Sequence, residues 1–307
     1  MTASTPFHGL SAFPITPTNN EGRVDTEALG RLLDRLCNAG VDSIGLLGST
    51  GTYAYLSRDE RRRAVEAGVE CVAGRVPLIV GVGALRTDHA RELARDAFAA
   101  RADALLMAPV SYTPLMQDEV FEHFRSVADA TDLPLCIYNN PGTTHFTFTP
   151  DLLVRLADLE TVRGVKMPAT SGIAEELAFL RARTDLAIGY SGDWIMADAM
   201  LAGADAFYSV LGGLLPAPVL RLVRSAQAGN VTETQFLDQR LTPLWDAFKA
   251  YGSLRVMYAL LERLDFEPVA PPLPILPLGP EARARIALAA EPFLEAEMDW
   301  LPARDQE

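Results

Sequence analysis

Short apolar runs alternate with longer segments of helical periodicity along most of the chain. A run of five to seven apolar residues bounded by turn residues is typical of a strand that is buried on both faces. We expect eight such strands, at residues 10–16, 41–47, 77–82, 104–108, 134–138, 162–166, 186–190 and 204–210.

The segments between the runs place apolar residues three or four positions apart, as an amphipathic helix does. The clearest are residues 26–39, 58–73, 88–101 and 118–130. Side chains that cap helices stand near the predicted starts: Asp25, Ser57, Thr87, Gln117, Thr149 and, before a helix at 194–201, Asp193. Eight strand–helix units predict an α/β fold, a (β/α)8 TIM barrel, with a doubly wound open sheet as the alternative.

The chain continues well beyond the eighth unit. Helical periodicity returns at residues 232–251, 253–264 and 281–297. Residues 268–280 are rich in proline, which lacks a backbone N–H, so we expect an extended segment laid over the barrel. We therefore predict a barrel catalytic domain of residues 1–230 and a C-terminal helical extension of residues 231–307 packed on it.

Composition is consistent with a large buried core, since 49% of the 307 residues are hydrophobic. No segment reaches the roughly 18 unbroken apolar residues of a membrane span. The first six residues have neither the basic region nor the apolar run of a signal peptide. Cys37, Cys71 and Cys136 form no CxxC pair, so we expect buried free thiols and a cytoplasmic protein.

The charged residues limit both the kinds of binding partner and the residues that could act as an amine nucleophile. A net charge of −13 disfavours binding to nucleic acid or anionic membranes. Of the 27 lysine and arginine residues, only Lys166 and Lys249 are lysines. Because arginine does not lose its proton readily, any amine nucleophile must be one of these two lysines.

The active site of a barrel lies at the carboxyl ends of its strands. The second predicted strand ends in Gly48-Ser49-Thr50-Gly51-Thr52. The adjacent hydroxyls of Ser49 and Thr50 and flexible glycine backbone next to a helix start suit a small carboxylate. An ordinary turn between strand and helix has the same composition, and the two interpretations stay open.

The fifth and sixth predicted strands end in Tyr138 and Lys166. A tyrosine hydroxyl at the barrel mouth can relay protons, although a half-buried structural tyrosine is the plainer interpretation. If Lys166 points inward, burial favours the neutral amine that attacks carbonyls, whereas a lysine that reaches the rim stays a surface charge. Adjacent strands would bring the two side chains face to face, which favours the catalytic interpretation.

Several motifs, in this order, resemble the dihydrodipicolinate synthase / N-acetylneuraminate lyase family. They span about residues 10–215, and the proline-rich residues 268–280 resemble the family's tail. The matching pieces are Gly48-Ser49-Thr50-Gly51, Leu56-Ser57-Arg58-Asp59-Glu60-Arg61, Tyr138-Asn139-Asn140-Pro141, Gly164-Val165-Lys166, Ser191-Gly192-Asp193 and Gly203-Ala204-Asp205 leading to Ser209-Val210.

The resemblance implies a role for each matched residue. Lys166 would form a Schiff base with pyruvate or a related 2-oxo acid, and Tyr138 would shuttle protons. Ser49 and Thr50 would hold the substrate carboxylate in the loop that Gly51 completes, with Thr50 handing protons to Tyr138. The pocket would also be lined by the carbonyl of Tyr208 and by Gly192. A homotetramer built as a dimer of dimers, without metal or organic cofactor, would follow.

The half of the site that would receive the second substrate departs from both named members. Thr143 stands where dihydrodipicolinate synthases carry an arginine. The tyrosine pair that those synthases carry before the proline of the fourth loop is shifted or lost in this chain, where the loop contains Tyr112. Trp194 and Ile195 follow Asp193, where neuraminate lyases carry acidic residues. We therefore expect a carbonyl partner less charged than aspartate semialdehyde and less hydroxylated than a sialic acid fragment.

The resulting hypothesis is a Schiff-base lyase or aldolase that acts on pyruvate or a related 2-oxo acid and on an aldehyde. A true 4-hydroxy-tetrahydrodipicolinate synthase is the first alternative. The others are a non-catalytic 2-oxo-acid binding protein, a phosphate-binding barrel enzyme that uses Gly192 and Gly212-Gly213, and a metal-dependent aldolase. The four histidines show no ligand spacing, which disfavours the last.

Overall fold

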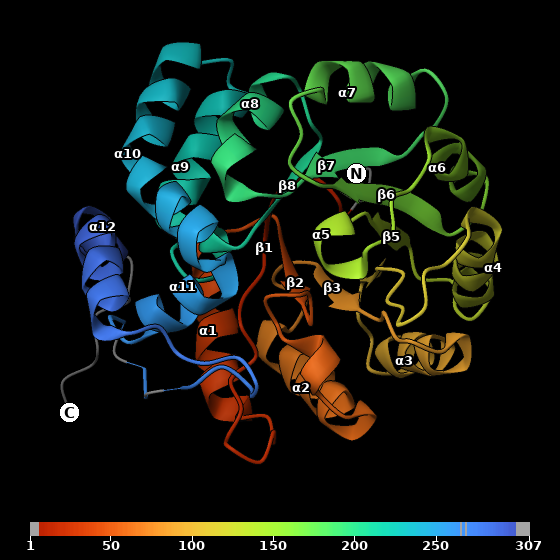
Figure 1. Ribbon diagram of the computed structural model, residues 1–307, viewed down its shortest axis with the longest axis horizontal. Coiled ribbons are helices and arrows are strands. Elements are labelled where there is room, and N and C mark those ends of the chain that lie inside the picture. Colours follow the sequence, from red (N-terminus) through yellow and green to blue (C-terminus); the bar gives the residue numbers. More distant parts are fainter. Residues whose placement is uncertain (1–5, 265, 268, 299–307) are drawn as a thin grey trace.

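The computed structural model describes residues 6–264, 266–267 and 269–298. Eight parallel strands close into a barrel, because β8 pairs with β1 as well as with β7. This closure confirms the TIM barrel and excludes the open sheet (Figure 1). The strands are β1 (Gly9–Ala12), β2 (Ser43–Leu46), β3 (Leu78–Gly81), β4 (Ala104–Met107), β5 (Leu135–Tyr138), β6 (Val162–Met167), β7 (Ala187–Tyr190) and β8 (Ala206–Ser209).

Helices cover the outside of the barrel, and short helical turns occupy the loops after the strands (Figure 1). The outer helices are α1 (Thr26–Ala39), α2 (Arg58–Val72), α3 (Thr87–Ala99), α4 (Gln117–Ala128), α6 (Pro150–Ala157), α7 (Ile173–Arg181), α8 (Met196–Leu201) and α9 (Pro216–Gln227). The loop turns are η1 (Tyr53–Tyr55), α5 (Pro141–Thr144), η2 (Asp193–Ile195) and η3 (Leu211–Gly213).

The expected helix caps are only partly correct. The side chains of Asp25, Ser57 and Thr149 accept hydrogen bonds from the first turns of α1, α2 and α6. Thr87 and Gln117 are instead the first helical residues of α3 and α4, and their side chains bond His123 and the 147–149 segment. The Asp193 side chain caps no helix start of its own.

Three helices follow the barrel: α10 (Val231–Tyr251), α11 (Ser253–Leu261) and α12 (Pro280–Met298). The first packs on α8 and α9, and the last packs on α9, α10 and α11. Between α11 and α12, the described residues 266–267 and 269–279 contain no helix or strand. Position 268 of the proline-rich segment lies outside the described residues. The proposed division at residue 230 stays a prediction. None of the helices in the described part is long and apolar enough to cross a membrane.

Aromatic rings fill the inside of the barrel, where Phe7, Phe13 and Tyr208 are at most 1% exposed. Glycines on the strands make room for them. A Cβ at Gly45 would lie 2.2 Å from the Phe13 ring, and one at Gly189 would lie 2.5 Å from the Tyr208 ring. The barrel is therefore a packed core whose upper layer is aromatic.

All three cysteines are free, as expected, but only Cys136 is buried. Cys37 and Cys71 are half-buried where α1 and α2 pack together, and the Cys71 thiol donates to the carbonyl of Gly30. The expectation of three buried thiols is wrong for these two, because an amphipathic helix leaves the border of its apolar face partly open to water.

Candidate active site

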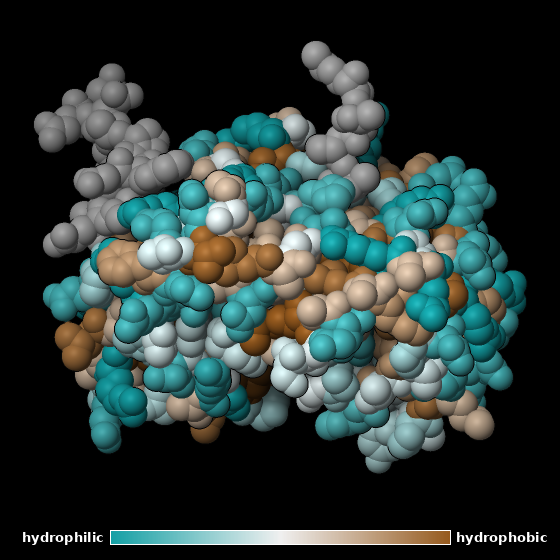
Figure 2. Space-filling view, turned by 90° about the horizontal axis from the view of Figure 1, so that it is seen from above, coloured by the Kyte–Doolittle hydropathy of each residue, from teal (hydrophilic) through white to brown (hydrophobic). Residues whose placement is uncertain are grey.

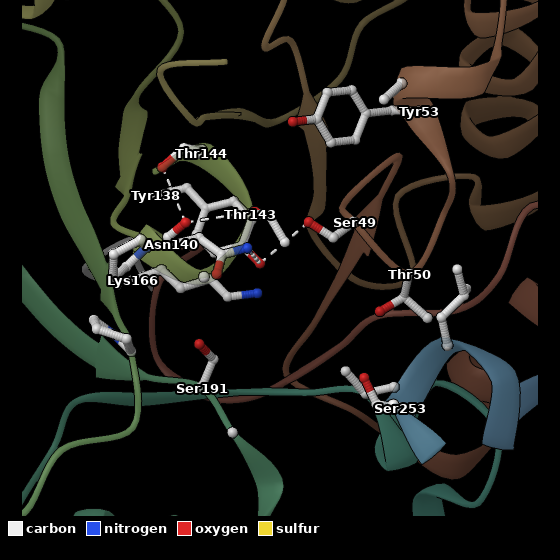
Figure 3. Close-up of a pocket in the computed structure, with 18 of the residues that line it drawn as sticks. Ser49, Thr50, Tyr53, Tyr138, Asn140, Thr143, Thr144, Lys166, Ser191 and Ser253 are labelled. Carbon is white, nitrogen blue, oxygen red and sulfur yellow. Dashed lines mark hydrogen bonds between the residues drawn. The ribbon is translucent and has the colours of Figure 1, made fainter. Parts of the chain in front are cut away.

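A cavity of about 740 Å³ opens at the carboxyl ends of the strands (Figure 3). Six of the predicted site residues line it: Ser49, Thr50, Tyr138, Thr143, Lys166 and Gly192. Gly51 and Tyr208 do not. A Cβ at Gly51 would lie 2.9 Å from the Leu47 backbone, so this glycine supports the loop from behind. The Tyr208 side chain is fully buried in the barrel below the cavity.

Lys166 reaches the cavity from inside the barrel and is 4% exposed. Its Nζ lies 4.0 Å from the centroid of the Phe13 ring, 4.2 Å from that of Tyr138 and 5.5 Å from that of Tyr208. Aromatic ring faces attract positive charge, and these three rings surround the buried amine. Figure 3 shows the amine ending in the open centre of the cavity.

Tyr138 stands beside Lys166, since the two are paired residues of the neighbouring strands β5 and β6. Its hydroxyl lies 3.3 Å from Ser49 Oγ and accepts a hydrogen bond of 2.9 Å from Asn140 Nδ2. The side chain is 7% exposed. The phenol is therefore held at the edge of the cavity by one hydroxyl and one amide.

The Gly48–Thr52 loop turns the hydroxyls of Ser49 and Thr50 toward different sides of the cavity. Ser49, rather than Thr50, is within hydrogen-bonding distance of Tyr138. Thr50 is 6% exposed and turns its hydroxyl into the same cavity from another side (Figure 3). The sequence could not separate two adjacent hydroxyls, because the curvature of the loop decides which of them meets β5.

Asp193 is a buried carboxylate at the start of η2, only 1% exposed. It accepts hydrogen bonds from the Ser209 hydroxyl and from the N–H groups of Val210 and Leu211. Burial raises the pKa of Asp193, while these hydrogen bonds and the charge of Lys166 oppose that rise. The carboxylate thus joins the loops after β7 and β8 and lies within electrostatic reach of the lysine.

Tyr53 brings a second phenol to the cavity and was not singled out from the sequence. The guanidinium carbon of Arg61 lies 5.1 Å from the centroid of its ring. Burial raises the pKa of Tyr53 to about 12, with a further contribution from Tyr138. Tyr53 is therefore protonated at neutral pH and can donate a hydrogen bond.

The outer part of the cavity is neutral and mixed in character. Thr143, Ser191 and Ser253 contribute hydroxyls, and Trp194 and Ile275 contribute apolar surface. Among the described lining residues, Lys166 is the one cation and Asp193 the one carboxylate. No described lining residue of the outer half is therefore charged, although Lys249 is close by, with its Nζ 5.8 Å from the ring centroid of Trp194.

Two contributions come from beyond the barrel and were missed at the sequence level. The start of α11 brings Gly252, Ser253 and Leu254 to the cavity, and the proline-rich segment brings Ile275. The sequence singled out the proline-rich segment as a whole but neither Ile275 nor Ser253 as a site residue, because only the packing of the extension brings them to the mouth. Asn140 lay within a recognised motif, but its bond to Tyr138 was not expected.

No group of three or more His, Cys, Asp or Glu side chains in the described part of the chain is arranged to hold a metal ion.

Comparisons with known proteins agree with one another. The Dihydrodipicolinate synthetase family matches residues 6–291. The 4-hydroxy-tetrahydrodipicolinate synthase of Nitrosococcus oceani is 33% identical over 292 residues, 94% of this chain and 100% of that protein. A solved dihydrodipicolinate synthase from Agrobacterium tumefaciens is 57% identical with a TM-score of 0.92, covering 94% of this chain and 98% of that one. A putative dihydrodipicolinate synthetase from Pseudomonas aeruginosa is 31% identical with a TM-score of 0.88, covering 92% and 98%.

Proposed function

The chain belongs to the dihydrodipicolinate synthetase family and is a lyase of that family, and we propose that it acts through a Schiff base between Lys166 and pyruvate or a related 2-oxo acid. The observation that carries the proposal is the Lys166 amine in the centre of the cavity, 4.2 Å from the ring centroid of Tyr138. No other lysine lines the described cavity.

The neutral amine of Lys166 adds to the 2-oxo carbon, and proton transfer gives a neutral carbinolamine. Tyr138 then donates its proton to the carbinolamine oxygen. The C–O bond breaks with its electron pair, water leaves, and the nitrogen lone pair forms the C=N bond of an iminium cation. The phenolate that remains takes a proton from C3 and leaves a neutral enamine. The enamine carbon attacks the aldehyde carbon, the C=O electron pair moves to the aldehyde oxygen, and that oxygen takes the proton from Tyr138. The restored iminium is then hydrolysed by water, which releases the product and the Lys166 amine.

The surroundings of Lys166 suit this sequence of charges. The iminium would carry its positive charge over the rings of Phe13 and Tyr138 and within electrostatic reach of Asp193. Thr50 and the loop backbone face the same space and would receive the carboxylate of the 2-oxo acid (Figure 3). A non-catalytic 2-oxo-acid binding protein would not need a hydrogen-bonded phenol beside the lysine, which favours the enzyme.

Borohydride trapping tests the proposal directly. Reduction in the presence of pyruvate should attach the reduced adduct to the peptide that contains Lys166 and abolish activity. Lys249→Arg, which changes the other lysine, should still be labelled, and Lys166→Arg should not. An unlabelled protein, or a label on Lys249 alone, would contradict the Schiff-base mechanism at Lys166.

The neutral outer cavity extends the proposal to the second substrate, an aldehyde without a second carboxylate. Thr143 and Trp194 line this region, and no described lining arginine is present. Losing charge-assisted bonds commonly lowers specificity by about 10²–10⁴. The test compares kcat/KM for pyruvate with aspartate semialdehyde against simple aliphatic, aromatic and short sugar aldehydes. If aspartate semialdehyde is strongly preferred, the protein is a true 4-hydroxy-tetrahydrodipicolinate synthase.

Assembly and compartment complete the proposal: a cytoplasmic homotetramer built as a dimer of dimers. Exposed apolar side chains support self-association, since Tyr112 is 97% and Leu85 66% exposed. Figure 2 shows apolar surface gathered in a band across one face, with polar residues on either side. The free cysteines are in keeping with a reducing compartment.

A further inference from the structure

Asn140 occupies a helix-capping position without capping the helix. An asparagine there ordinarily accepts a hydrogen bond from an N–H of the first helical turn. The Asn140 side chain makes no such bond to α5, and its amide donates to the Tyr138 hydroxyl at 2.9 Å instead (Figure 3). Its backbone carbonyl accepts from the N–H groups of Thr143 and Thr144 at 3.1 and 3.0 Å. The backbone of Asn140 therefore holds the start of α5, and its side chain is free to bond the Tyr138 hydroxyl.

This bond gives the hydrogen bonds around Tyr138 a direction. An amide nitrogen donates and does not accept, so the Tyr138 oxygen must be the acceptor toward Asn140. The phenolic hydrogen therefore points away from Asn140, toward Ser49 Oγ at 3.3 Å or toward a group in the cavity. Donation runs from Asn140 to Tyr138 to Ser49 or the substrate.

We propose that Asn140 is a positioning residue for proton transfer, which aims the Tyr138 hydrogen at the reacting group and stabilises the phenolate after the proton has left. The inference rests on the proposed Schiff-base function. The phenolate arises when Tyr138 protonates the departing carbinolamine oxygen, and it disappears when Tyr138 takes the C3 proton. Asn140 itself gains and loses no atom.

The burial of Tyr138 makes this donor important. At 7% exposure, the phenolate oxygen has little access to water, so protein donors must replace its hydration. Among the described residues, Asn140 and Ser49 are the two hydrogen-bond partners of that oxygen. Removing a fixed donor from an oxyanion commonly slows the step by about 10²–10³.

Exchange of the C3 protons of pyruvate in D₂O, followed by proton NMR at saturating pyruvate, tests the proposal on the whole protein. Asn140→Ala removes the donor, and Asn140→Asp keeps the shape but replaces the donor with a carboxylate. Both should exchange at least about 10-fold more slowly, with an unchanged half-saturating pyruvate concentration. Asn38→Ala, which removes an exposed asparagine side chain of α1, should exchange at the unmodified rate.

Borohydride adducts trapped after equilibration and thermal unfolding separate the outcomes. Normal adduct yield and unfolding temperature with slow exchange support the role of Asn140. If either variant exchanges the C3 protons at a rate within twofold of the unmodified protein, the role of Asn140 is overturned and the Schiff-base function is not affected. The same holds if slow exchange is accompanied by a lower adduct yield or a lower unfolding temperature. An unmodified protein that gives no adduct with pyruvate overturns the Schiff-base function and this inference together.

Discussion

At the scale of single residues, the proposed nucleophile, proton carrier and carboxylate-binding loop are held in different ways. Lys166 is surrounded by three aromatic rings, and Tyr138 is hydrogen-bonded on two sides. The Thr50 hydroxyl makes no hydrogen bond within the part of the chain that the structure describes. An unbonded hydroxyl turned into a cavity is available to a ligand. Each residue can therefore be tested by a different kinetic constant.

Tyr138→Phe removes only the hydroxyl, so we expect the protein to fold. Proton transfer by a placed side chain typically contributes about 10²–10⁴ in rate. Turnover should fall by about that factor, while the apparent affinity for pyruvate changes little. Steady-state kinetics with pyruvate and the best aldehyde measure both constants. A nearly normal kcat would assign Tyr138 a structural role.

Ser49→Ala and Thr50→Ala should have different kinetic effects, although the residues are adjacent. Ser49 bonds the Tyr138 hydroxyl, so its loss should lower kcat more than it raises KM for pyruvate. Loss of the Thr50 hydroxyl should mainly raise KM for pyruvate, by about 10-fold for one hydrogen bond. The opposite pattern would return the proton relay to Thr50, as the sequence resemblance implied.

At the scale of elements, the strands position the side chains of the site, and glycines on the strands leave room for aromatic rings inside the barrel. The aromatic layer under Lys166 exists because Gly45 on β2 and Gly189 on β7 leave room for rings from neighbouring strands. Helices α3 and α4 are joined by the bond between Thr87 and His123, 2.8 Å long. These contacts predict how single substitutions alter stability.

Gly45→Ala would place a Cβ 2.2 Å from the Phe13 ring. Overpacking of this kind destabilises by about 1–3 kcal/mol, and the shift of Phe13 should also lower activity. Gly30→Ala in α1 is the matched control, because its Cβ would lie 3.9 Å from Cys71 Sγ and alanine favours helix. Urea denaturation should show a loss for the first variant only.

His123 should make stability depend on pH. Burial lowers the pKa of His123 to about 4 from 6.5. Between these values the unfolded chain binds the proton and the folded chain does not, so stability falls as the pH falls through that window. The slope is at most about 1.4 kcal/mol per pH unit.

Urea denaturation from pH 7 to pH 4 measures this effect. His123→Gln should remove part of the slope, and His8→Gln, at an exposed position, should leave it unchanged. Equal slopes for the unmodified protein and His123→Gln would contradict the assignment to His123.

At the scale of the whole molecule, the loops after β2, β3 and β4 bring exposed apolar side chains to one end of the barrel. Tyr55, Leu85 and Tyr112 belong to these loops and are 47%, 66% and 97% exposed. Because such side chains in water favour association, this end is expected to take part in the proposed tetramer.

Sedimentation velocity should therefore give an assembly of four 33.3 kDa chains. Leu85→Asp places a charge in the exposed apolar group and should shift the protein toward smaller species. Glu70→Lys, on the exposed side of α2, is the control and should sediment as the unmodified protein does. A monomeric unmodified protein would remove the assembly from the proposal.

The sequence by itself determined the fold class and pointed to the two residues at the centre of the proposed site. Strand–helix alternation is a local pattern, and eight parallel strands end at one rim, so Tyr138 and Lys166 had to meet there. Tertiary structure alone decided that Ser49 bonds Tyr138, that Asn140 donates to it, and that Ser253 and Ile275 reach the cavity. These contacts depend on loop curvature and on packing between distant segments, which leave no periodic signal in the chain.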